Sequence, residues 1–139
     1  MGWSSSIQER IKRRLVAKVY IDSVTDYISR RFSVPIGGMS IVFEPVIAGT
    51  VRPDLVIVYN GTWFIVEFKT RPNLVQDLGV VMRYKRAVDE YVKPQRSIPI
   101  LAYVYTAPSQ SVPAIARGLK PLVVLHLARG TYMVLYESL

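Results

Sequence analysis

The sequence predicts a single α/β domain in which a mixed β-sheet carries helices on its faces. Three observations predict this class. The chain has 139 residues, which is the usual size of one domain. Apolar residues recur at helical spacing in two long segments, residues 6–31 and 73–92, and segments of strand length lie between and after them. The predicted order is α-β-β-β-α-β, followed by α-β-β.

The composition of the chain favours a polyanionic partner. Eighteen Lys and Arg residues against ten Asp and Glu residues give a net charge of +8, and half of all residues are hydrophobic, enough for a core. Such a charge favours nucleic acid or an anionic membrane surface, although a merely soluble basic protein has the same composition. The absence of Cys excludes disulfides, thiolate nucleophiles and Cys-based zinc sites, and the single His126 excludes chemistry that needs paired histidines.

The sequence shows no targeting or membrane segment. Its first residues lack the apolar core of a secretory signal, and no apolar run is long enough to span a bilayer. We therefore expect a cytoplasmic protein without a membrane partner. No internal repeat divides the chain, so residues 1–139 are expected to form one domain.

The first helix is predicted at residues 6–31. Ser6 and Glu9 have the spacing of a capping box, in which the two side chains satisfy free backbone N–H groups at the start of a helix. Its apolar side repeats every four residues, at Ile7, Ile11, Leu15 and Val19. Its polar side is basic and carries Arg10, Lys12, Arg13, Arg14 and Lys18.

Three strands are predicted next, at residues 39–49, 53–59 and 62–69. Gly49 ends the first of them. Asn60-Gly61 joins the second and third, because this pair is the strongest short signal for a two-residue hairpin turn.

The second helix is predicted at residues 73–92. Its candidate buried positions are Leu74, Leu78, Val81, Val88 and Tyr91. Residues 98–107 follow as a strand that is apolar on both faces and therefore central in the sheet. A short helix at residues 111–119 and a final hairpin, with strands at 121–128 and 131–138, complete the chain.

The register of the first hairpin brings three charged residues together. A two-residue turn pairs Tyr59 with Thr62, Ile57 with Phe64 and Asp54 with Glu67. Directly opposed residues project from one face of a sheet, and Lys69, two residues beyond Glu67, shares that face. Glu44 stands opposite Asp54 if the loop around Gly49 is symmetric.

Two carboxylates side by side repel each other, so one of them takes up a proton or a cation settles between them. Oxygen ligands favour a hard ion such as Mg²⁺ or Mn²⁺. Alternatively, Asp54 caps a turn at the strand start, and Glu67 and Lys69 belong to a solvated edge strand. A face that is apolar at one end and acidic at the other indicates a cleft, and the charges share their face with Val56, Val58, Trp63 and Ile65.

Two short motifs face each other across this hairpin: Pro-Asp at residues 53–54 and Glu-Phe-Lys at residues 67–69. Together they resemble the signature of the PD-(D/E)xK nuclease superfamily. The α-β-β-β-α-β order also resembles the core of that superfamily, over about residues 6–106. The resemblance implies a restriction-endonuclease-like fold, to which the C-terminal hairpin is added.

The resemblance also implies a role for each residue of the cluster. Asp54 and Glu67 would bind Mg²⁺ or Mn²⁺, with the backbone carbonyl of Phe68 as a further ligand. Lys69 would orient or activate the attacking water and offset charge on the phosphate.

Members of the superfamily often add another acidic residue, for which Glu9 and Glu44 are the candidates. We prefer Glu44, because Glu9 has a simpler role in the capping box. Some branches carry a Gln and a Tyr one turn apart on the second helix; here Gln76 and Tyr84 lie two turns apart, so Gln76 is kept only as a neighbour of the site. Basic residues that could hold the flanking DNA backbone are Arg71, Arg83, Lys85 and Arg86.

As a whole, the resemblance implies a metal-dependent nuclease that hydrolyses phosphodiester bonds in DNA. The small, basic chain is similar in these respects to archaeal-type Holliday junction resolvases, which act as homodimers on branched DNA. A generic endonuclease or exonuclease of the same superfamily is the close alternative. A catalytically inactive nucleic-acid-binding module, or a subunit of a larger nuclease, is the alternative from another class.

Overall fold

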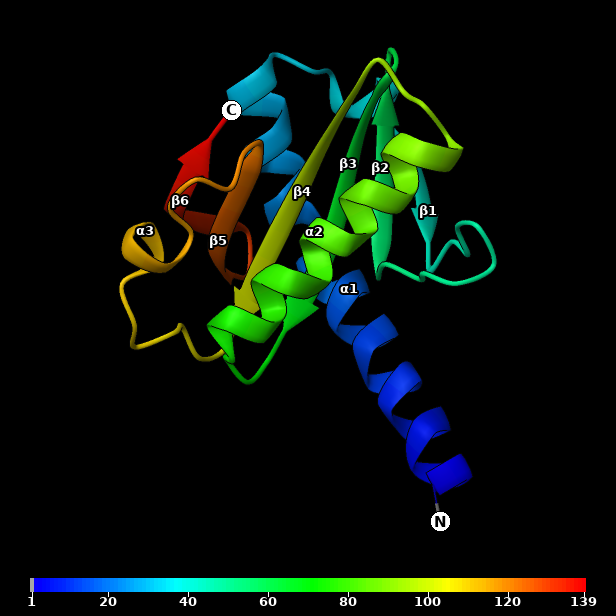
Figure 1. Cartoon of the computed structure of the whole chain (residues 1–139), viewed down its shortest axis with the longest axis vertical. Coiled ribbons are helices and arrows are strands. Elements are labelled where there is room, and N and C mark those ends of the chain that lie inside the picture. The colour runs from blue at the N-terminus through cyan, green and yellow to red at the C-terminus, as the bar shows by residue number, and fades with distance from the viewer. Residues whose placement is uncertain (1) are drawn as a thin grey trace.

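The computed structural model describes the backbone of residues 2–139 and the side chains of residues 7–139. A six-stranded mixed sheet lies between α1 on one face and α2 with α3 on the other (Figure 1). This confirms the predicted α/β class. In chain order the elements are α1 (Gly2–Phe32), η1 (Ile36–Gly38), β1 (Ser40–Phe43), β2 (Leu55–Tyr59), β3 (Thr62–Lys69), α2 (Leu74–Tyr91), β4 (Arg96–Val104), α3 (Val112–Ile115), β5 (Leu122–Ala128) and β6 (Thr131–Ser138).

The strands lie in the sheet in the order in which they occur in the chain, from β1 to β6. Neighbouring pairs are antiparallel except β3–β4 and β4–β5, which are parallel. The three parallel strands therefore end at the same edge of the sheet, and β2, antiparallel to β3, starts there. Ligands of open α/β sheets usually bind at such an edge.

The β2–β3 hairpin has the predicted register. Asn60 and Gly61 both have positive φ, 49° and 83°, as a two-residue hairpin turn of this kind requires. Tyr59 pairs with Thr62, and the remaining β2 residues pair in step up to Leu55 with Val66.

The apolar side predicted for the first helix does not face the core. The helix begins at Gly2, so Ser6 is an interior residue and not a cap. Ile11, Leu15 and Val19 are exposed, Leu15 by 57%. The side that packs on the sheet is instead formed by Ala17, Tyr20, Val24, Tyr27 and Ile28.

The reason lies in where the sheet ends beneath α1. Figure 1 shows the N-terminal half of α1 extending beyond the sheet, while its second half crosses the sheet face. Two hydrogen bonds fix that second half: Ser23 Oγ donates to the carbonyl of Ala128 (2.6 Å), and Tyr27 Oη donates to Glu137 Oε2 (2.5 Å). The four-residue apolar repeat falls mainly on the protruding half, where no strand covers it.

In the second helix Leu74, Leu78, Val81 and Val88 are buried, as predicted. Tyr91 is a wrong prediction, because it is the last helical residue and is 64% exposed. Tyr84 lies on the buried side instead, between Val81 and Val88, and packs against β2 and β3.

The predicted strand at residues 39–49 shortens to β1. Glu44 and Ala48 adopt left-handed backbone conformations, with φ of 48° and 56°, which interrupt an extended strand. Pro45 between them has no N–H to donate to the ladder. The remaining edge strand is largely exposed.

The other elements agree with the prediction. β4 is buried on both faces and central, and β5 and β6 form the final hairpin. The short helix contracts to α3. No helix within residues 2–139 is both long enough and apolar enough to cross a membrane.

Candidate functional site

Two buried carboxylates lie side by side at the edge where β2 begins and β3 ends. The backbone N–H of Asp54 donates to Glu67 Oε1 (3.3 Å), and the backbone N–H of Phe68 donates to Asp54 Oδ2 (2.8 Å). Asp54 is 4% exposed and Glu67 is 1% exposed. The hairpin register thus places both acids on one face, as the sequence predicts.

The guanidinium of Arg13, a side chain of the same protein, lies between these two acids. Arg13 Nη2 lies 2.6 Å from Glu67 Oε2 and 3.0 Å from Asp54 Oδ1. The protruding half of α1 brings this guanidinium to the edge of the sheet at which β3 ends. From the sequence, Arg13 is only one of several basic residues on the first helix, because the contact joins residues 54 positions apart.

Burial controls the charge state of the pair. Burial and the neighbouring Asp54 carboxylate raise the pKa of Glu67 to about 8, against the attraction of Arg13 and Lys69. Burial also raises the pKa of Asp54, and Arg13 opposes this rise most. Burial and the mutual repulsion of the two acids therefore favour the protonated form of Glu67, in spite of the nearby cations.

Lys69 is held between two carboxylates. Its Nζ lies 3.6 Å from Glu67 Oε2 and 4.0 Å from Asp77 Oδ1. Asp77 is itself buried, accepts a hydrogen bond from Tyr103 Oη (2.8 Å), and accepts another from the backbone N–H of Asn73 (2.9 Å). Burial and this hydrogen bond raise the pKa of Tyr103, so the hydroxyl stays protonated and keeps donating.

Asp77 and Tyr103 are not among the residues predicted for the site. A signal existed, because Asp77 lies on the apolar side of the second helix between Leu74 and Leu78. An acid on a buried helix side needs a partner. That partner could not be identified, since Tyr103 lies on a different element.

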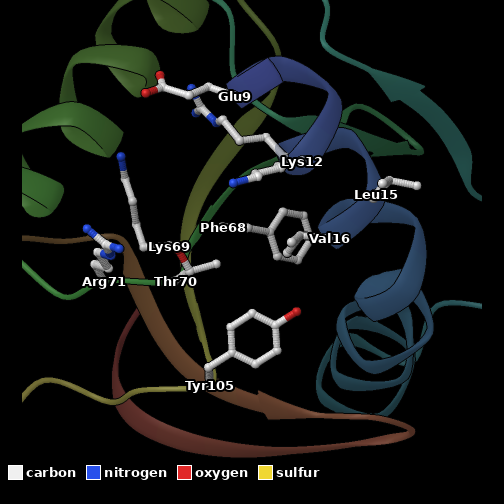
Figure 2. Close-up of a pocket in the computed structure, with 10 residues that line it drawn as sticks. Glu9, Lys12, Leu15, Val16, Phe68, Lys69, Thr70, Arg71 and Tyr105 are labelled. Carbon is white, nitrogen blue, oxygen red and sulfur yellow. The ribbon is translucent and has the colours of Figure 1, made fainter. Parts of the chain in front are cut away.

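A cleft of about 850 Å³ opens between α1 and the ends of β3 and β4. Four cationic residues and one acid, Glu9, line it, together with apolar groups (Figure 2). The cationic residues are Lys12, Arg13, Lys69 and Arg71. Asp54 and Glu67 do not line the cleft themselves; Arg13, which touches both, does. The guanidinium therefore lies between the acids and the cleft.

Glu44 and Glu9, the two candidates for an additional acidic residue, lie in different surroundings. The backbone N–H of Glu44 donates to the carbonyl of Asp54 (3.0 Å), so these residues are opposed as expected. The Glu44 carboxylate, however, lies 3.9 Å from Arg14. Within the described residues no group of three acidic or His side chains could hold a metal ion together, so Glu44 is not gathered with the pair. Glu9 lines the cleft.

Arg71, a predicted DNA contact, and Gln76, a predicted neighbour of the site, both follow β3 closely in the chain. Arg71 lines the cleft directly after β3. Gln76 is exposed on the first turn of α2, where its Oε1 accepts a hydrogen bond from Asn73 Nδ2 (2.9 Å). Gln76 thus orders the start of α2 and does not line the cleft.

The other three lie farther along α2, and none lines the cleft. Lys85 Nζ donates to Asp89 Oδ2 (2.8 Å) and to Ser97 Oγ (2.7 Å), so this amine is already engaged at the start of β4. Arg83 and Arg86 are exposed on the helix surface.

The acid pair fits a small divalent cation. Asp54 Oδ1 and Glu67 Oε2 already contact one and the same cationic nitrogen, so their oxygens converge on a common point. Mg²⁺ is commonly held by one or two carboxylates, with water and substrate oxygens completing its shell. The residues present therefore fit Mg²⁺ or Mn²⁺, provided that the Arg13 guanidinium moves aside.

No family model and no curated protein matches the sequence. Among solved structures, a protein of unknown function from Silicibacter pomeroyi superposes with a TM-score of 0.50 at 13% identity, over 88% of this chain and 70% of that one. An FdxN element excision controlling factor protein from Anabaena variabilis superposes with a TM-score of 0.52 at 17% identity, over 86% of this chain and 99% of that one. At these identities the similarity shows a shared fold.

A third structure, Pyrococcus furiosus SfsA in complex with Ca²⁺, aligns over 79% of this chain and 59% of that one at 19% identity. Its TM-score is 0.34.

Proposed function

We propose that the protein is a metal-dependent nuclease that hydrolyses phosphodiester bonds in DNA. One observation carries the proposal: oxygens of Asp54 and Glu67 converge on a single cationic position, and the amine of Lys69 lies 3.6 Å from one of them. The neighbouring cleft is rich in cations, as a site for a polyanionic backbone needs to be.

In this proposal Asp54 and Glu67 would hold Mg²⁺ or Mn²⁺, and the Phe68 carbonyl would be a further ligand. A divalent ion there would offset the charge of the phosphate and lower the pKa of a bound water. Lys69 adds positive charge next to the reacting phosphate. Asp77 is a positioning residue, because its carboxylate holds the Lys69 amine from the side opposite Glu67.

Arg13 has two places in this proposal. It neutralises the acid pair in the present structure, and with an ion held there its side chain would turn into the cleft. There its guanidinium would join Lys12 and Arg71, which line the same cleft, in holding the DNA backbone. Because Arg13 already lines the cleft, this change needs only rotation of a side chain.

The substrate class is proposed from the charge of the chain and from one structural neighbour. The Anabaena variabilis protein is named for control of excision of the FdxN element, and a nucleic-acid-related role agrees with the net charge of +8. We propose branched DNA as the substrate and a homodimer as the active form. Met133 and Val134, exposed on the edge strand β6, are candidate interface residues.

The Arg13 contact also favours a second candidate function, that of a catalytically inactive nucleic-acid-binding module or nuclease subunit. A guanidinium that permanently occupies the cation position would leave the acid pair neutralised and unable to hold an ion. This module would use the same cationic cleft to bind DNA without cutting it.

Cleavage assays separate the two functions. Supercoiled plasmid and four-way junctions are incubated with the protein in Mg²⁺, in Mn²⁺ and in EDTA. The nuclease proposal predicts metal-dependent products that disappear with Glu67→Gln and persist with the control Glu90→Gln, an exposed acid on α2. Binding without cleavage in either metal identifies the inactive module.

A further inference from the structure

Tyr105 has an unusual backbone and an exposed ring at the edge that carries the site. It follows β4 directly, and the parallel pairing of Lys69 with Tyr103 places it close to the end of β3. Its φ is 70°, and the N–H of Thr106 donates to the carbonyl of Val104 (2.9 Å), which closes a γ-turn around it. The left-handed region is rare for aromatic residues. Nevertheless Tyr105 remains 67% exposed.

One aromatic contact holds the ring while leaving most of it free. The Tyr105 and Tyr20 rings meet edge to face, with centroids 6.0 Å apart and planes at 81°. Tyr20 is buried on α1 and part of the core. The ring of Tyr105 is therefore fixed from one side by the core and lines the cleft with the other (Figure 2).

The surroundings of the ring match one chemical class of ligand. Lys12, Arg13, Lys69 and Arg71 line the same cleft. Proteins that bind single-stranded nucleic acid combine a cationic groove for the backbone with aromatic rings on which bases stack. Inside a duplex both faces of each base are covered by its neighbours, so away from the duplex ends an exposed ring can stack only on a base that has left the helix.

We infer that Tyr105 stacks an unpaired nucleobase of DNA beside the acid pair, so that the substrate must present unpaired nucleotides there. This inference rests on the proposed function and specifies its substrate: single strands, frayed ends and branch points qualify, and an intact duplex does not. The phosphate next to the stacked base then lies among the cations near Lys69. Tyr105 is a specificity residue with no part in the bond-breaking step.

Metal-free binding tests this stacking. The affinity of the protein for a fluorescent oligothymidylate and for a duplex of equal length is measured by anisotropy in EDTA at fixed salt. Tyr105→Asn removes the ring with a residue that tolerates positive φ, and Tyr105→Phe keeps the ring. Tyr91→Asn, at a tyrosine that is 64% exposed on α2, is the matched control.

The expected result is tighter binding of the single strand than of the duplex. Tyr105→Asn weakens single-strand binding by about 5- to 150-fold, the usual value of one base stacked on an aromatic ring. Tyr105→Phe and Tyr91→Asn stay within about twofold of the wild type. Duplex binding is unchanged in all three variants.

A second measurement needs no variant. An oligonucleotide containing 5-iodouracil is irradiated in complex with the wild-type protein, and the crosslinked peptide is identified by mass spectrometry. Stacking predicts attachment at Tyr105. Absence of single-strand binding, wild-type affinity of Tyr105→Asn, or crosslinking only elsewhere overturns the inference.

Failure of this inference and failure of the proposed nuclease are distinguishable. In one case Tyr105-dependent binding is absent, while the wild type cuts intact duplex and Glu67→Gln does not. The stacking inference is then wrong and the proposed nuclease activity is supported. In the other case Tyr105-dependent binding is present, but no substrate is cut in any metal. The nuclease proposal is then wrong and the stacking inference is supported.

Discussion

Arg13 and Glu67 form a 2.6 Å contact between Nη2 and Oε2, and the same nitrogen reaches Asp54 Oδ1 at 3.0 Å. The chain thus supplies its own counter-charge to an acid pair that is almost completely buried. Any external cation must replace this guanidinium. Arginine and metal ion are therefore expected to compete for one position.

Replacement of Arg13 by Gln should lower stability and raise metal affinity together. Loss of the guanidinium leaves the buried pair uncompensated, which costs about 2 kcal/mol, a value reduced because the Arg13 side chain is 42% exposed. The affinity for Mn²⁺, measured by calorimetry, is expected to rise by roughly 10- to 30-fold, because no contact between Arg13 and the two acids has to be broken before the ion binds.

Arg10→Gln on the same helix is the control, because Arg10 is exposed. It should leave both quantities unchanged. Equal Mn²⁺ affinity of the wild type and Arg13→Gln would show that arginine and ion do not compete.

The pH dependence of stability should report on Glu67. Its pKa rises from 4.5 to about 8 on folding, so unfolding releases a proton between these values. The free energy of unfolding therefore falls as the pH rises through this window. We expect a falling melting temperature from about pH 5 to about pH 8 in EDTA.

Glu67→Gln should flatten this pH profile and exceed the wild type in stability at the alkaline end, because the amide carries no charge to bury. Parallel profiles of the two proteins would show that Glu67 is ionised in the fold throughout the range.

The hydrogen bond from Tyr103 to Asp77 should matter both for stability and for Lys69. Tyr103→Phe removes the donor from a buried carboxylate and is expected to cost about 1–3 kcal/mol in chemical denaturation. If Asp77 positions Lys69, the same variant lowers kcat of the proposed nuclease and leaves KM unchanged. Tyr136→Phe, on β6, should change neither.

Truncation of side chains on the two sides of α1 should change the stability of the protein by very different amounts. Leu15→Ala removes a side chain that is 57% exposed and should change stability by less than about 0.5 kcal/mol. Ile28→Ala empties a completely buried position and should cost about 2–5 kcal/mol. Thermal unfolding distinguishes them, and a large loss in Leu15→Ala would mean that the four-residue repeat is covered after all.

The features that could be predicted from the sequence are those fixed locally. Asn60-Gly61 sets a turn with two positive φ values, and this turn alone determines that Asp54 faces Glu67. The fully apolar segment around Ile100 likewise identifies the central strand, because only burial on both faces explains it.

The features that could not be predicted depend on where a helix crosses the sheet. The repeat of Ile11 and Leu15 indicates an amphipathic helix, but it cannot show that the sheet ends before reaching them. The same crossing point carries Arg13 to the acid pair. Glu44 illustrates a further limit: its backbone stands opposite Asp54, while its side chain turns towards Arg14.

Crystals soaked in Mn²⁺ and measured at the manganese absorption edge test the central claim most directly. The account predicts one anomalous peak between Asp54 Oδ1 and Glu67 Oε2, with Arg13 turned into the cleft. A peak elsewhere, or undisturbed contacts from Arg13 to both carboxylates at saturating Mn²⁺, would contradict it.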